Sequence, residues 1–254
     1  MPPQAPARQE FVILTHVRSG SSMLADLLAR NAIGNAREDL NQRSLTKADP
    51  SWNPEKVLTE ARCAEQSAFF GSKVMIHWLE DLKRHARMPA ASDKQILQRL
   101  FAAGFTTIHL YRSDTVAAAV SFTLAELSGQ WHRVDGRAVG TTPPSQFRLP
   151  SWAAMEPLIS DNLAWLDDCK ERLHATAATL RPRVVDLCYE DLVLDKTAQL
   201  RRVTNALPGA EGRSLSVLSG HAKLADEISE ELCLRWRADH PDYEETRVTG
   251  HASA

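Results

Sequence analysis

Five consecutive residues near the amino end combine the groups that bind an anion: Arg18, Ser19, Gly20, Ser21 and Ser22. They follow an apolar run over 11–15 that predicts a buried strand, and they precede a segment over 23–30 that predicts a helix. Small residues at such a junction leave backbone N–H groups unpaired, and the helix adds partial positive charge. The guanidinium supplies a two-pronged donor. The segment therefore predicts a loop that binds phosphate or sulfate.

The loop differs from the common nucleotide-binding loop, in which Gly-Lys is followed by Ser or Thr, the lysine reaches the outer phosphates and the hydroxyl holds magnesium. Here Gly20 is followed by Ser21, Ser22 and Met23. The missing lysine argues against hydrolysis of ATP or GTP, although a P-loop-type nucleotide kinase or NTPase stays open as an alternative. A Ser/Gly-rich turn that only caps the helix is the simpler explanation of the loop by itself.

A second candidate anion site lies about ninety residues further along the chain. Arg112 directly follows a predicted strand over 105–111, and Ser121 lies within the predicted helix over 114–127. In a parallel sheet, residues at the carboxyl ends of strands face the ligand crevice. Two anion sites on neighbouring strand ends would suit a nucleotide charged at both its 5′ and 3′ positions, as in 3′-phosphoadenosine 5′-phosphosulfate (PAPS).

Strands and helices alternate along the chain. Further strands are expected at 73–76 and 183–189, and further helices at 54–69, 93–103, 152–180 and from 190 onward. This order predicts an α/β fold of P-loop-like, three-layer type, with a central, mostly parallel sheet flanked by helices. Residues 35–53 are expected to form a loop, 129–150 an exposed loop or lid, and 240–254 a flexible tail.

Composition narrows the class of protein. The 254 residues carry a formal net charge of −2 and are 43% hydrophobic, which predicts one domain over 1–254 and argues against a nucleic-acid partner. No apolar run approaches the roughly 20 residues that cross a bilayer, and the first residues do not resemble a secretion signal, so a cytoplasmic location is expected. The spacing of Cys63, Cys169, Cys188 and Cys233 predicts neither a metal site nor a disulfide framework.

At this point the sequence resembles a known family, the bacterial PAPS-dependent sulfotransferases related to trehalose 2-sulfotransferase. Residues 11–28 resemble its first strand, 5′-phosphosulfate loop and helix, and 112–122 resemble its 3′-phosphate segment. Residues 71–75 are similar to its Gly-Gly-Lys-Leu-Met segment, and 189–193 to its Tyr-Glu-Asp-Leu turn. Trp131 also falls where the family tends to carry a tryptophan. These similarities occur in the family's order over most of the chain.

The resemblance implies transfer of a sulfuryl group from PAPS to a hydroxyl of a carbohydrate, glycolipid or natural-product acceptor, leaving adenosine 3′,5′-bisphosphate and needing no metal. Arg18 and the backbone of 19–22 would hold the 5′-phosphosulfate, and Arg112 with Ser121 the 3′-phosphate. Lys73 would lie beside the reacting groups. The partner would be a small molecule, with no transmembrane segment, and related enzymes make a homodimer plausible. The chain between Glu38 and Lys73 is short for a disaccharide enzyme of this family, so trehalose itself is not assumed.

Three residues are candidates for the general base. Aligning Gly34 with the family's glycine places Glu38 at the catalytic position and makes Asp39 the fallback, although Asn35 and Ala36 replace the family's Glu-Pro pair. His16 beside the loop is a competing base, because imidazole suits proton transfer near neutral pH.

Three further interpretations stay open at this stage. His77 is expected either to pack or to contact the acceptor, as are the aromatic and basic residues around Trp131. The altered surroundings of Glu38 also leave open a non-catalytic nucleotide-binding relative.

Overall fold

A computed structural model describes residues 8–41, 52–134, 137–140, 148–219 and 227–244, and its centre is a parallel sheet. The sheet has four strands in the order β2-β1-β3-β6. Their bounds are β1 Gln9–Thr15, β2 Phe69–Met75, β3 Thr106–Tyr111 and β6 Val184–Cys188. Every pairing is parallel, so all four strands end at the same edge. The predicted α/β fold with a parallel sheet is confirmed.

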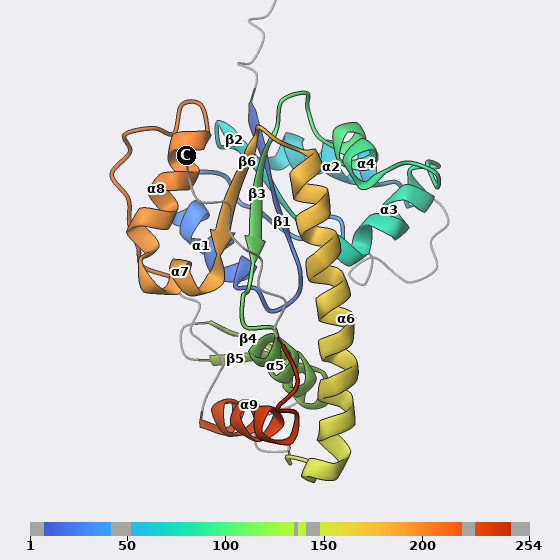
Figure 1. The fold of residues 1–254 in the computed structure, drawn as a ribbon. Helices are drawn as coiled ribbons and strands as arrows, with labels where there is room; N and C mark the ends of the chain where they lie inside the picture. The colour runs from blue at the N-terminus through green and yellow to red at the C-terminus, as the bar shows by residue number, and fades with distance from the viewer. Residues whose placement is uncertain (1–7, 42–51, 135–136, 141–147, 220–226, 245–254) are drawn as a thin grey trace, which may run out of the picture.

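Helices cover both faces of this sheet (Figure 1). One face carries α1 (Ser21–Arg30), α7 (Tyr189–Leu194) and α8 (Lys196–Ala206). The other carries α2 (Pro54–Ala64), α3 (Leu79–His85), α4 (Asp93–Leu100) and the 28-residue α6 (Trp152–Thr179). Strand β1 supplies both cores, because alternate side chains point to opposite faces. Phe11 and Ile13 pack towards α1, whereas Val12 and Leu14 pack towards α2, α3 and α4.

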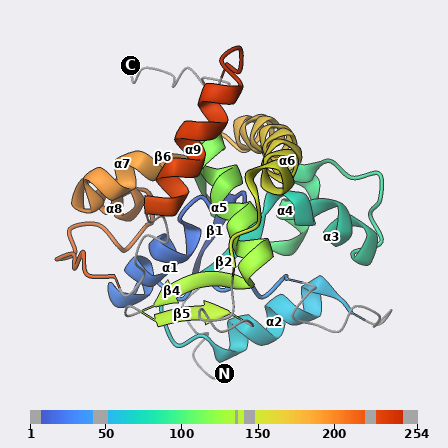
Figure 2. The ribbon, with the colours of Figure 1, turned by 90° about the horizontal axis from the view of Figure 1, so that it is seen from below.

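A third group of elements lies beyond the carboxyl ends of the strands, as Figures 1 and 2 show. It consists of α5 (Thr115–Ser128), α9 (Glu227–Asp239), the first half of α6, and the hairpin of β4 (Gln130–Val134) with β5 (Arg137–Gly140). Val116 and Val120 of α5, Leu163 of α6 and Trp236 of α9 share one buried cluster. The arrangement encloses the strand ends, where the sequence places the anion-binding residues.

The expectation that residues 129–150 form an irregular loop is wrong for the first part of that segment. Strands β4 and β5 pair antiparallel there, with an irregularity between Gln130 and His132. The sequence shows no alternation of apolar and polar side chains at this place. A two-stranded ribbon is stabilised chiefly by packing against a neighbour, here α5, and this contact is invisible to local sequence patterns. Residues 141–147 lie outside the described part of the chain.

The expectation of a flexible tail from residue 240 is wrong for residues 240–243. The His240 ring stacks on Trp236 with centroids 4.2 Å apart, and the Tyr243 hydroxyl donates to Asp167 over 3.0 Å. Helix α9, which carries Trp236, was not predicted: its buried positions 229, 232, 233 and 236 have helical spacing, but two of them are Ser229 and Cys233, while Ile228 and Leu234 are exposed. Residues 245–254 lie outside the described chain.

Several predicted boundaries also shift. The helix expected over 54–69 ends at Ala64, and the strand expected at 73–76 begins at Phe69. The helix expected from 190 onward is two helices, α7 and α8, because Asp195 leaves the helical conformation and caps α8. A further short turn of 3-10 helix, η1 (Ile76–Trp78), and helix α3 follow β2 directly.

A charged cluster joins three helices on the face that carries α6. Asp93, at the start of α4, accepts hydrogen bonds from Arg172 of α6 at 2.8 and 2.7 Å and pairs with Lys83 of α3 at 2.8 Å. Burial alone would raise the pKa of Asp93, but the hydrogen bonds and charges of Arg172 and Lys83 outweigh it and lower the pKa to about 2. The ionised carboxylate therefore stabilises the packing of α3, α4 and α6.

This cluster predicts a measurable loss of stability in acid. A pKa held at about 2 in the folded protein, against about 3.9 in the unfolded chain, contributes about 2 kcal/mol above pH 4, and this contribution is lost as the pH falls from about 4 to about 2. Asp93→Asn should lower the free energy of unfolding at pH 7 and flatten its decline in acid, measured by urea unfolding at several pH values. Asp161→Asn, at an exposed position of α6, is the control. A wild-type slope in the Asp93→Asn protein would contradict the assignment.

Candidate functional site

The segment between β1 and α1 folds as a tight loop that is tied to the strand ends. The Ser19 hydroxyl donates to the His16 carbonyl over 2.9 Å, and the Thr15 hydroxyl donates to the Leu110 carbonyl of β3 over 2.7 Å. Ser19 is fully buried, so its side chain serves the loop itself. The N–H groups at the start of α1 have no acceptors within the helix, which leaves them able to bind an anion.

Gly20 is required by its backbone and by a neighbour. Its φ of 81° is in the left-handed region, and a Cβ at this position would come within 2.3 Å of the Tyr189 ring. Tyr189 is the first residue of α7, so the ring brings the strand end of β6 against the loop. The glycine therefore allows the chain to turn into α1 while it lies against the Tyr189 ring.

Arg18 reaches across to the second predicted anion segment. Its backbone is also left-handed, with φ of 59°. Its Nε donates to the Ser121 hydroxyl of α5 over 2.9 Å, and its Nη1 donates to the Trp131 carbonyl of β4 over 2.6 Å. The sequence predicted two separated anion-binding groups, one around Arg18 and one at Arg112 with Ser121. In the structure the two groups of residues are in direct contact.

A second guanidinium, that of Arg112, approaches the backbone of Arg18. Arg112 Nη1 is 3.4 Å from the Arg18 carbonyl, and its Cζ lies 5.0 Å from the centre of the Tyr189 ring. Burial, and secondarily the charge of Arg112, lowers the pKa of Arg18 to about 10. Arg112 Nε is buried without a hydrogen-bond partner among the described residues. Two partly buried like charges raise the free energy of the unliganded site, and a bound anion would relieve this repulsion.

Glu38 and Lys73 meet at the edge of the same loop. Lys73 Nζ lies 2.7 Å from Glu38 Oε1 and donates to the Ser22 hydroxyl over 3.0 Å. The position of Glu38 is set by its neighbour, because the Arg37 carbonyl accepts from the Lys73 backbone N–H over 2.8 Å, beside β2. The Lys73 side chain is only 6% exposed, whereas that of Glu38 is 33% exposed. A partly exposed carboxylate, whose Oε2 accepts from Asn41 at 3.0 Å, thus sits beside a buried ammonium at the start of α1.

The other predicted bases lie in different surroundings. His16 is fully buried, its Nδ1 bonds to the Val17 carbonyl at 2.8 Å, and its Nε2 accepts from the Arg112 backbone N–H at 3.2 Å. Burial lowers the pKa of His16 to about 4. Because both ring nitrogens have backbone partners, His16 supports the Arg112 backbone. Neither nitrogen is available to take a proton from a substrate hydroxyl. Asp39 is half-buried, and burial raises its pKa.

His77 packs among aromatic side chains. Its ring lies 5.2 Å from Trp165 and 5.8 Å from Trp78 between centroids. Trp165 in turn stacks on Phe122, the residue after Ser121, at 5.4 Å. His77 therefore belongs to the packing between η1, α6 and α5, one of the two roles expected for it.

Comparison with known families identifies the family of the chain. The sequence model of the Stf0 sulphotransferase family matches residues 10–239, which include both guanidinium groups, the Glu38–Lys73 pair and all four strands of the sheet. The chain belongs to the Stf0 sulphotransferase family. This confirms the resemblance to trehalose 2-sulfotransferase-like proteins and supports sulfotransfer as the general activity. The chain has no match among curated proteins.

Two charged residues of this Stf0 family member, Glu190 and Lys170, contact the backbone next to Arg112, and the sequence motifs assign neither of them a role. The Glu190 carboxylate accepts from the backbone N–H groups of Ser113 and Asp114 at 3.0 and 3.2 Å. Lys170 of α6 donates to the Ser113 carbonyl at 2.9 Å. A signal for Lys170 was present, because it falls on the apolar face of α6, between Leu166 and Leu173. A lysine at a core position needs a polar partner.

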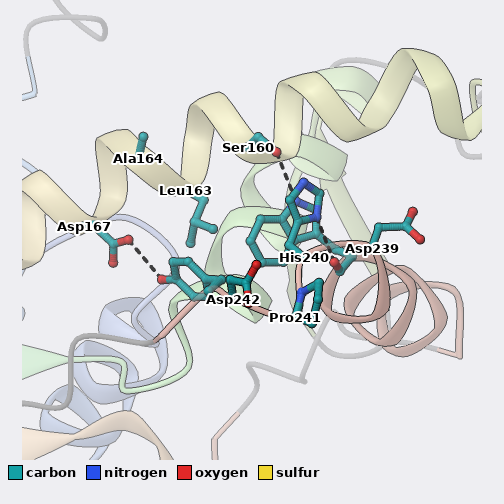
Figure 3. Close-up of a pocket in the computed structure, with 10 residues that line it drawn as sticks. Ser160, Leu163, Ala164, Asp167, Asp239, His240, Pro241 and Asp242 are labelled. Atoms are coloured by element: carbon teal, nitrogen blue, oxygen red, sulfur yellow. Dashed lines mark hydrogen bonds between the residues drawn. The ribbon is translucent and has the colours of Figure 1, made fainter.

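The hollow drawn in Figure 3 is a different place. It has a volume of about 560 Å³ and lies between α6 and α9, lined among others by Leu163, Asp167, Trp236 and Tyr243. None of the predicted site residues lines it. Within the described part of the chain, no group of three His, Cys, Asp or Glu side chains could hold a metal ion. In the same residues, no helix has the length and apolar character needed to span a membrane.

The contact between Gly20 and Tyr189 leads to a prediction about stability. Gly20→Ala and Gly209→Ala both place a side chain at a left-handed φ, which costs about 1–2 kcal/mol. Only the alanine at position 20 also meets the Tyr189 ring, since nothing lies within 4 Å of a Cβ at Gly209. Urea unfolding should therefore show a further loss of about 1–3 kcal/mol for Gly20→Ala. Equal losses in the two variants would mean that the ring moves aside freely.

Proposed function

We propose that this Stf0 family member transfers the sulfuryl group of PAPS to a hydroxyl of a carbohydrate, glycolipid or natural-product acceptor, with Glu38 as general base. The observation that carries the proposal is the line from Glu38 through Lys73 to Ser22, joined by contacts of 2.7 and 3.0 Å at the start of α1. This line places a carboxylate and an ammonium beside the loop suited to a phosphosulfate. Such a pair supplies both a proton acceptor and a positive charge.

The residues around the loop fit the donor. Bound PAPS would supply the sulfuryl group and carry the phosphate that leaves. The N–H groups at the start of α1 would hold its 5′ end, and Arg112 with Ser121 its 3′-phosphate. Arg18 lies between these groups, because its guanidinium contacts Ser121 while its own backbone belongs to the loop. The lowered pKa of Arg18, caused by burial and by Arg112, supports a site that is complete only with an anion.

The chemistry then divides among few side chains. As the bond from the acceptor oxygen to sulfur forms and the bond from sulfur to the 5′-phosphate oxygen breaks, Glu38 takes the proton of the acceptor hydroxyl. Lys73 holds the carboxylate in place and faces the negative charge that develops on the leaving oxygen, together with the loop N–H groups. Positioning and preorganised charge supply most of the rate enhancement, as in phosphoryl transfer.

Replacement of the base gives the first test. Glu38→Gln keeps the shape of the side chain but cannot accept the proton, so sulfation should fall by about 10²–10⁴-fold while adenosine 3′,5′-bisphosphate still binds. The measurement is the mass gain of one sulfuryl group across a panel of hydroxylated acceptors with PAPS. Asp39→Asn removes the neighbouring charge and should change the rate by less than about threefold. A large loss in Asp39→Asn and none in Glu38→Gln would assign the base to Asp39.

Binding of the donor product gives the second test. Arg18→Ala and Arg112→Ala should each weaken binding of adenosine 3′,5′-bisphosphate by about 10–100-fold, because each removes a charged hydrogen-bond donor. Isothermal titration calorimetry measures this, with Arg201→Ala at an exposed position of α8 as the control. Unchanged affinity in both site variants would refute the donor site. Stronger thermal stabilisation by ATP with magnesium than by adenosine 3′,5′-bisphosphate would instead favour a kinase.

A further inference from the structure

The backbone that follows Arg112 is held by side chains from three other parts of the fold. Glu190 of α7 accepts from the N–H groups of Ser113 and Asp114. Lys170 of α6 donates to the Ser113 carbonyl, and Arg237 of α9 donates to the Asp114 carboxylate over 2.8 Å. Three charged residues distant in sequence thus hold Ser113 and Asp114 at the start of α5. This indicates that the conformation after Arg112 matters to the site.

Glu190 is the member of this group closest to the Arg112 guanidinium. Its Oε1 lies 3.7 Å from Arg112 Nε, and its Oε2 accepts from the Cys188 thiol at 2.9 Å. Burial would raise the pKa of Glu190, but the hydrogen bonds from Cys188 and from the Ser113 backbone outweigh it and lower the pKa. The carboxylate is therefore ionised at neutral pH. Its negative charge orients the Nε edge of the guanidinium towards α7.

The residue before Glu190 fixes the other side of the guanidinium. The Tyr189 ring lies against Gly20 and beneath Arg112. Rotation of Arg112 is thereby limited by a ring on one side and by a carboxylate at its Nε edge. A guanidinium held in this way loses little conformational entropy when it binds a phosphate, which increases its affinity.

We propose that Glu190 is a positioning residue that sets the preference of this site for nucleotides carrying a 3′-phosphate, by holding the Ser113 and Asp114 backbone and the Nε edge of Arg112. The proposal rests on the function proposed above, in which Arg112 binds the 3′-phosphate. A carboxylate near an anion site also repels the anion. Here two N–H donors, a thiol and a guanidinium offset its charge, so its effect on geometry exceeds the repulsion.

The test compares two nucleotides that differ only in the 3′-phosphate. Glu190→Gln keeps the size of the side chain, but its amide accepts only through one oxygen and turns an NH2 group towards a backbone N–H. The affinity for adenosine 3′,5′-bisphosphate should fall by about tenfold, and that for adenosine 5′-monophosphate should change by less than about twofold. Asp191→Asn, the neighbouring exposed carboxylate of α7, is the matched control and should leave both affinities unchanged.

Two further measurements separate positioning from general damage. Hydrogen exchange at the Ser113 and Asp114 amides should become faster in Glu190→Gln, because these groups lose an acceptor. On an Arg112→Ala background, Glu190→Gln should produce no additional loss of the 3′-phosphate preference. Equal losses for both nucleotides, an unchanged preference, or a full additional loss on the Arg112→Ala background would each overturn the proposal.

The wild-type protein distinguishes this failure from failure of the proposed function. If the wild type binds both nucleotides equally, Arg112 does not bind a 3′-phosphate, and the donor site and the role of Glu190 are both refuted. If the wild type prefers adenosine 3′,5′-bisphosphate and Glu190→Gln retains that preference, only the role of Glu190 is refuted.

Discussion

The partly buried positive charge of Arg18 and Arg112 is the constraint on which the arrangement at the strand ends depends. Arg18 and Arg112 follow adjacent strands, and Arg112 Nη1 lies 3.4 Å from the Arg18 backbone carbonyl; burial, and secondarily the charge of Arg112, lowers the pKa of Arg18. Among the residues that the structure describes, Arg18 has no carboxylate partner, and Arg112 has Glu190, whose Oε1 lies 3.7 Å from Arg112 Nε. Neutral acceptors, the Ser121 hydroxyl and the Trp131 carbonyl, take the donors of Arg18 instead. Two guanidinium groups with one carboxylate partner leave excess positive charge at one place, which is the electrostatic requirement for binding an anion.

The parallel sheet is what brings these charges together. Thr15 of β1 lies opposite Leu110 of β3 in the register, so the two strands end at the same level. Arg18 therefore lies three residues after Thr15, and Arg112 lies two residues after Leu110. His16 ties the two exits to each other, because its ring accepts from the Arg112 N–H. A one-residue slip of register would turn the side chains of a strand to the opposite face and would destroy the core and the site together.

Local signals explain what could be predicted from the sequence. The apolar run of β1, the small residues after it and the periodic segment of α1 are all contiguous, and the long α6 is predicted to within one residue at its end. Hairpin β4–β5 and helix α9 escaped prediction because their stability comes from α5 and α6, which are distant in sequence.

The features of the candidate site also differ in whether they depend on local sequence or on tertiary contacts. The anion loop was evident from its residues, but the contact of Arg18 with Ser121 was not, since it depends on the left-handed backbone at Arg18 and on the docking of α5. Glu38 had no local signal, because a glutamate in a loop is usually solvated. It came from the family resemblance alone. Its contact with Lys73 arises from the isolated bridge between Arg37 and Ser72, a tertiary interaction.

The two pairs of charged residues, Arg18 with Arg112 and Glu38 with Lys73, lie at different strands. The residues proposed to bind the donor are thus separated from those proposed to take part in the reaction. The guanidinium groups follow β1 and β3 at the centre of the sheet, whereas Lys73 belongs to β2 at its edge and Glu38 lies beside that edge. Ser22 connects them, because its hydroxyl accepts from Lys73 while its backbone belongs to the first turn of α1. In the proposed function, a donor held at the ends of the central strands would face the edge strand, where Glu38 is partly exposed. On that proposal, affinity for the donor depends on the central strands and the rate of transfer on the edge strand, so the two can be altered independently.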